Sequence, residues 1–133
     1  DVYKRQGADA RAHVRALAAM VGCDIHPINN RRILQTLRKQ FGANEAAINA
    51  WCGNWISDGF DAYEALIAAD KTRGRFSFGD TPTLADVYLI PQVESARRFN
   101  VDMNRWPLIS AIDHACGELD AFKQAAPLAQ PDA

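Results

Sequence analysis

The chain has 133 residues, which is enough for one domain with a substantial hydrophobic core. Its 15 basic and 16 acidic residues leave a net charge of −1, so charge gives it no reason to bind nucleic acid or an anionic membrane surface. No apolar run approaches the ~20 residues that span a bilayer, and no membrane partner is expected.

Residues 1–6 show neither the apolar stretch of a signal peptide nor a helical pattern. The chain also starts with Asp1 rather than Met. We therefore expect residues 1–8 to be a linker or foreign to the protein, and residues 9–133 to form the domain.

Apolar residues recur at helical spacing over residues 9–21, which predicts an amphipathic helix. Pro27 is expected to interrupt this helix, because proline lacks an amide donor and disfavours helical geometry at His26. The pattern resumes and runs to Phe41, where Gly42 predicts a helix end.

The strongest pattern covers residues 44–69, where apolar side chains keep i, i+3, i+4 spacing throughout and predict a long helix. Residues 71–80 contain two glycines and predict a loop. Its two aromatic residues, Phe76 and Phe78, are expected to pack onto the core.

A capping box predicts the start of the next helix. The Thr83 hydroxyl can accept from the first turn, and the Asp86 carboxylate can reach back to the Thr83 amide. The helix is expected to run from Leu84 to about Phe99. Because it is apolar on nearly every face, we expect it in the middle of a bundle.

Pro107 suits the first turn of a further helix that reaches about Cys116. A short helix is predicted over residues 118–124, and an irregular tail from Pro127 onward. No stretch alternates strictly enough to predict a strand. The predicted fold class is therefore all-α, a helical bundle.

Three cysteines, Cys23, Cys52 and Cys116, form no close pair, which argues against a disulfide framework or a zinc site and fits the reducing cytoplasm. All three are expected to be small core residues. The larger aromatic residues are also expected in the core: Trp51, Trp55, Tyr63, Tyr88 and Trp106.

Polar residues gather around the predicted break at Pro27. Relative to the apolar stripe of the next helix, Asn30 lies almost in phase, Arg31 on the flank and Arg32 nearly opposite. The residues alone favour a structural interpretation, in which Asn30 caps the helix and both arginines are solvated. Arg97 and Arg98, at the end of another helix, suit its dipole.

A Gly79-Asp80-x-x-Thr83-x-Ala85-Asp86 run that opens an apolar helix resembles the signature of the C-terminal domain of glutathione transferases. The flanking motifs are similar to the zeta class, which holds maleylacetoacetate and maleylpyruvate isomerases. They are Pro91-Gln92-Val93, Ala96-Arg97-Arg98-Phe99 and Gln130-Pro131-Asp132. The resemblance covers residues 9–133 and implies that a thioredoxin-like domain precedes them in the complete enzyme.

The resemblance implies that glutathione is the cofactor and that His26, Asn30, Arg31 and Arg32 lie beside it. We also expect Arg32 to bind a carboxylate of the small dicarboxylate substrate or of glutathione, because it is turned away from the apolar stripe and a guanidinium matches a carboxylate. The family pattern, with its arginine immediately before the phenylalanine, implies that Arg98 binds a substrate carboxylate and that Arg97 is solvated. No catalytic residue is expected in this chain, since the group that activates the thiol belongs to the thioredoxin-like domain.

The segments around residues 25–32 resemble bacterial maleylpyruvate isomerase more than the maleylacetoacetate enzyme. The complete enzyme is expected to be a homodimer, and this chain alone to have little activity. Two alternatives stay open: a general glutathione transferase, and a non-catalytic transferase-like module for protein association.

Overall fold

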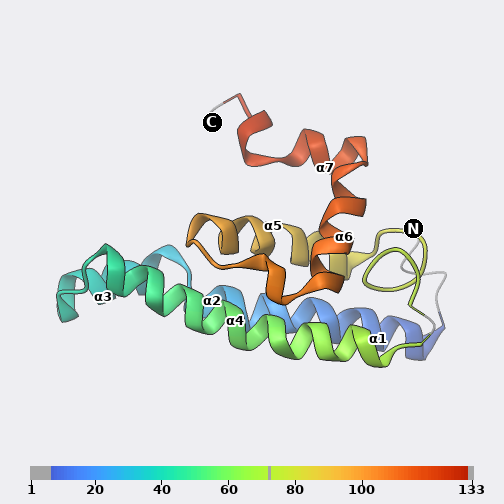
Figure 1. The fold of residues 1–133 in the computed structure, drawn as a ribbon, viewed down its shortest axis with the longest axis horizontal. Helices are drawn as coiled ribbons and strands as arrows, with labels where there is room; N and C mark the ends of the chain where they lie inside the picture. The colour runs from blue at the N-terminus through green and yellow to red at the C-terminus, as the bar shows by residue number, and fades with distance from the viewer. Residues whose placement is uncertain (1–6, 72, 132–133) are drawn as a thin grey trace.

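The computed structural model describes residues 7–71 and 73–131 (Figure 1). Every regular element in these two ranges is helical, which confirms the all-α fold class. Two long rods run antiparallel. One is α1 (Ala8–Ala19), continued by a π-helical turn (Met20–Ile25) and α2 (His26–Ile28), and the other is α4 (Glu45–Ala69). Between them in the chain, α3 (Arg31–Phe41) lies at one end of the molecule.

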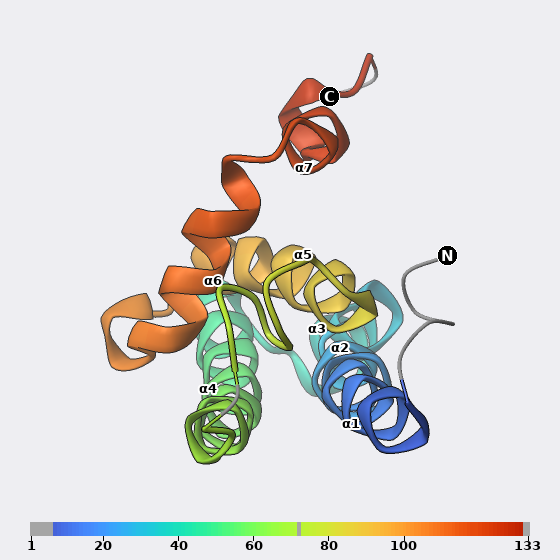
Figure 2. The ribbon, with the colours of Figure 1, turned by 90° about the vertical axis from the view of Figure 1, so that its right-hand side faces the viewer.

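The remaining helices cover one side of the two rods. α5 (Leu84–Arg98) packs on α1 and α4, and α6 (Pro107–Gly117) packs against α4 and α5 (Figure 2). α7 (Asp120–Ala125) and a 3₁₀ turn (Pro127–Ala129) extend away from this body. The largest fully buried side chains include Leu17, Phe60, Tyr63, Leu89, Trp106 and Ile109.

Pro27 does not interrupt the first rod, so that prediction is wrong. His26 has helical torsion angles (φ −64°, ψ −44°), and its amide donates to the carbonyl of Val21, five residues back. In an α-helix a proline ring clashes with the carbonyl four residues earlier. The wider π-helical turn offsets that carbonyl, so the rod continues through Pro27 and breaks only at Asn29 and Asn30.

Two glycines let other helices approach this π-helical turn. A Cβ at Gly59 of α4 would overlap the side chain of Ile25, and a Cβ at Gly22 would overlap the ring of Tyr88. The turn is therefore packed closely on both α4 and α5.

The other predicted helix limits agree with the structure within about two residues. Gly42, at φ 67°, ends α3, and the Asn44 side chain caps α4. The capping box of α5 is present, with both the Thr83 and the Asp86 bonds formed. In the loop before α5, Phe76 is buried and Phe78 packs against the core, as predicted.

Some burial predictions are wrong. α5 is not enclosed, because the described elements cover only its Leu89 and Val93 face, and Leu84, Val87 and Tyr88 are 39%, 55% and 43% exposed. Tyr63 and Trp106 are buried as expected, while Trp51 and Trp55 are half-buried. Cys52 and Cys116 are buried, but Cys23 lies on the outer side of the π-helical turn and is exposed. The tail is not wholly irregular, since Pro127 begins a 3₁₀ turn.

None of the helices in the described ranges is both long and apolar enough to cross a membrane. The assignment of residues 1–8 as a linker or foreign segment stays a prediction, and residues 1–6 lie outside the described part of the chain.

Candidate functional site

A hollow of about 780 Å³ lies where the bend between α2 and α3, the start of α4 and the end of α5 meet. Ten of the twelve described residues that line it are polar, among them His26, Asn30, Arg31, Arg38, Glu45 and Arg98. Most of its charge is positive, since it has three arginines and one glutamate.

Asn30 positions the start of α3. Its backbone is extended (φ −73°, ψ 162°), and its Oδ1 accepts the amides of Arg32 at 3.1 Å and Ile33 at 3.3 Å. This confirms the predicted cap. Because the helix begins there, Arg31, Gln35 and Arg38 follow at i, i+4 and i+7 and share the face that lines the hollow.

Asn29, the neighbouring residue, is 8% exposed and also lines the hollow. Its Nδ2 donates to the carbonyl of Ile25 at 3.3 Å. A carbonyl oxygen can only accept, so this bond fixes the orientation of the amide. Asn29 Oδ1 is buried and accepts no hydrogen bond from the residues that the structure describes. Within the described part of the chain, this acceptor is therefore left unsatisfied.

Arg38 and Glu45 form a bidentate ion pair at the edge of the hollow. Arg38 Nε donates to Oε1 at 2.9 Å and Nη2 donates to Oε2 at 3.1 Å. The hydrogen bond with Glu45 raises the pKa of Arg38, and the hydrogen bond with Arg38 lowers the pKa of Glu45. Both groups are therefore charged at neutral pH.

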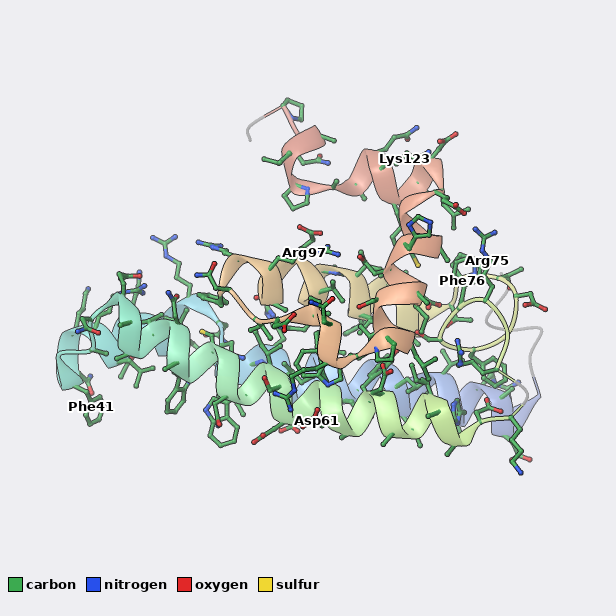
Figure 3. All side chains as sticks on the ribbon, viewed as in Figure 1. Phe41, Asp61, Arg75, Phe76, Arg97 and Lys123 are labelled. Carbon is green, nitrogen blue, oxygen red and sulfur yellow. The ribbon has the colours of Figure 1, made fainter. Side chains whose placement is uncertain are left out.

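Arg31 and Arg98 differ from Arg38, because neither forms an ion pair with any residue in 7–71 or 73–131. The Arg98 guanidinium lies 5.9 Å from the ring centroid of Phe99, a cation–π contact that leaves its N–H groups available. Arg97, labelled in Figure 3, does not line the hollow and forms ion pairs with Glu94 and Asp113.

The hollow brings together four of the five predicted site residues, namely His26, Asn30, Arg31 and Arg98. Arg32 is exposed but does not line it, so the structure does not place Arg32 beside Arg98. The sequence prediction missed Arg38 and Glu45. Helical spacing from Arg31 would have indicated Arg38, whereas Glu45 reaches the hollow only because the chain turns at Gly42.

Residues 30–122 match the family described as "Glutathione S-transferase, C-terminal domain". A maleylpyruvate isomerase from Ralstonia sp. is 78% identical over 125 residues, which are 94% of this chain and 59% of that protein. A solved structure of the holo form of maleyl pyruvate isomerase, a bacterial zeta-class glutathione transferase, superposes with a TM-score of 0.95 at 76% identity. The superposition covers 96% of this chain and 60% of the chain in that structure.

A maleylacetoacetate isomerase from Anaeromyxobacter dehalogenans, solved with dicarboxyethyl glutathione and citrate in its active site, is 41% identical with a TM-score of 0.85. This superposition covers 92% of this chain and 54% of the chain of the Anaeromyxobacter enzyme. This chain therefore spans less than two thirds of the length of these relatives. The similarity is to the zeta class, as the sequence motifs implied, and the chain belongs to the family of glutathione transferase C-terminal domains.

Proposed function

We propose that this chain contributes the carboxylate-binding part of the active site of a glutathione-dependent cis–trans isomerase. The substrate is maleylpyruvate or maleylacetoacetate, both products of aromatic-ring degradation, and the high identity to the Ralstonia enzyme favours maleylpyruvate. The observation that carries the proposal is the pair Arg31 and Arg98, two guanidiniums without ion-pair partners among the described residues, on one hollow.

The hollow fits glutathione and a small carboxylate ligand. Its volume lies within the range of about 300–1,000 Å³ that is common for small-molecule sites. Guanidiniums without an ion-pair partner in the described part of the chain, as at Arg31 and Arg98, suit carboxylates. Glutathione supplies the thiolate that adds reversibly to the maleyl double bond, so that the bond rotates before elimination gives the fumaryl isomer.

The residues of this chain hold the ligands during that reaction. Arg31 and Arg98 bind carboxylates and stabilise the negative charge that develops next to the substrate carbonyl. His26 and Asn30 lie beside glutathione. Arg32, exposed on the first turn of α3, contacts a carboxylate outside the hollow.

The test joins this chain to the part of the Ralstonia relative that it does not span. Isomerisation of maleylpyruvate and maleylacetoacetate is then measured with and without glutathione. Turnover that requires glutathione and leaves its concentration unchanged supports the proposal. A protein that conjugates chloro-aromatic compounds but isomerises neither substrate is a general transferase, and one that binds glutathione without any turnover is an association module.

Three substitutions in the same fusion test the residue roles. Arg31→Met and Arg98→Met should each raise KM about tenfold or more, because each removes charged hydrogen bonds to the ligand. Arg97→Met is the matched control, since it removes the same charge from the neighbouring position outside the hollow. Arg32→Met should raise KM too, and an unchanged KM would remove Arg32 from the site.

The complete protein is proposed to be a cytoplasmic homodimer. The three cysteines without a disulfide are consistent with a reducing compartment. Light scattering of the fusion protein would test the dimer.

A further inference from the structure

We propose that Glu45 sets the charge specificity of the hollow. By pairing with Arg38, Glu45 neutralises one of the three arginine charges on the hollow. Arg31 and Arg98 then remain without an ion-pair partner among the described residues, so that the site suits a dianionic ligand better than a trianionic one. This inference rests on the proposed carboxylate-binding function, and it adds a specificity-determining residue to that function.

The Arg38–Glu45 pair is held by local structure. Arg38 lies in the last turn of α3, and Glu45 is the first residue of α4. Between them the chain reverses at Gly42, whose φ of 67° is costly for other residues, and Asn44 caps α4. Both oxygens of Glu45 are used by Arg38, at 2.9 and 3.1 Å, and two of the guanidinium nitrogens are used in return.

The other two arginines that line the hollow, Arg31 and Arg98, determine how many ligand carboxylates it can bind. Arg31 and Arg98 make no ion pair with the residues of the described ranges, so each can present a two-donor fork to a carboxylate. A ligand with two carboxylates can therefore pair one carboxylate with each of these two guanidiniums. A third carboxylate could meet only the remaining Nη donors of Arg38, and the charge of Glu45 beside them would repel it.

The substitution Glu45→Gln tests whether the charge of Glu45 keeps a third carboxylate away from Arg38. Glutamine keeps the shape and one acceptor oxygen but loses the charge, so Arg38 becomes available to a ligand. The pair is solvent-exposed, with side-chain exposures of 39% and 75%, so a moderate effect is expected. We expect the variant to bind a trianion about two- to fivefold more tightly, with the affinity for a dianion nearly unchanged.

The experiment is an NMR titration of the arginine Nε–Hε signals in this 133-residue chain at low ionic strength. The dianionic probe is maleate and the trianionic probe is propane-1,2,3-tricarboxylate, at a pH where all carboxyl groups are ionised. In the wild-type chain both probes should shift the Arg31 and Arg98 signals, and the Arg38 signal should stay in place. In Glu45→Gln the trianion should also shift the Arg38 signal.

Glu118→Gln is the matched control, because it changes net charge equally and Glu118 pairs with Arg75, outside the hollow. Equal gains in trianion affinity in both variants, or no gain in Glu45→Gln, would overturn the role of Glu45. That result would leave the proposed function standing if the probes still shift Arg31 and Arg98. Absence of any shift at Arg31 and Arg98 in the wild-type chain would count against both proposals.

Discussion

The buried carboxylate of Asp86 accepts the amide of Thr83 at 2.7 Å through Oδ2, within the capping box of α5. The Thr83 hydroxyl donates to the same oxygen at 3.1 Å, and Oδ1 accepts the amide of Ser77 at 2.8 Å. The Ser77 hydroxyl in turn accepts from Tyr63 of α4 at 2.9 Å. One side chain therefore links the start of α5 to the preceding loop and, through that loop, to α4.

Asp86→Ala should lower the free energy of unfolding by about 3 kcal/mol or more, because it leaves buried donors without an acceptor. Urea unfolding followed by circular dichroism measures the loss. Asp102→Ala is the control, since Asp102 caps a 3₁₀ turn in an exposed position through the Asn104 amide. It should cost about 1 kcal/mol. Equal losses in the two variants would contradict the central role of Asp86.

Glu64 of α4 provides a similar link to α6. Its two oxygens accept the amides of Leu108 and Ile109 at 2.8 and 2.9 Å, in the first turn of α6. Glu64→Ala should therefore increase hydrogen exchange at these two amides about tenfold or more, since each loses a charged acceptor. Glu64→Gln retains one acceptor oxygen and should have a smaller effect. Unchanged exchange in the alanine variant would show that solvent replaces the carboxylate without cost.

The sequence predicted most of the helices because their signals are local. Thr83 and Asp86 mark the start of α5, and Gly42 marks the end of α3, through interactions within a few residues. Glu45 was missed because its partner Arg38 lies across a turn. The predicted helix break at Pro27 was wrong because the π-helical turn depends on packing against Gly59 and Tyr88, which are distant in the sequence. The exposed face of α5 was not predicted for the same reason, because a helix that is apolar all round does not indicate which of its faces other helices cover.

Gly59 and Gly53 lie on the same helix, and alanine should affect them in opposite directions. At Gly59 an added Cβ would overlap Ile25 in the π-helical turn, so Gly59→Ala should destabilise the protein by about 1–3 kcal/mol. At Gly53 the nearest atom would be Val101 Cγ2 at 3.8 Å, an ordinary contact. Gly53→Ala should stabilise the protein by up to about 1 kcal/mol through helix propensity. Thermal unfolding compares the two, and equal midpoints would show that Ile25 moves aside freely.

The three cysteines should differ in reactivity and in their effect on stability at high pH. Burial raises the pKa of Cys52 from 9.0 to about 11 and that of Cys116 from 9.0 to about 12, whereas Cys23 is exposed. In the native protein a thiol reagent should therefore modify Cys23 rapidly, and Cys52 and Cys116 only after unfolding.

The same shifts predict a loss of stability in alkali. Between about pH 9 and pH 11 to 12, the unfolded chain releases the protons of Cys52 and Cys116 while the folded chain keeps them, so unfolding becomes more favourable as pH rises. Urea unfolding at increasing pH measures this slope. In the double variant Cys52→Ala, Cys116→Ala the slope over this range should become shallower, although the protein is less stable overall because cavities remain. An identical slope in both proteins would mean that other groups cause the alkaline loss.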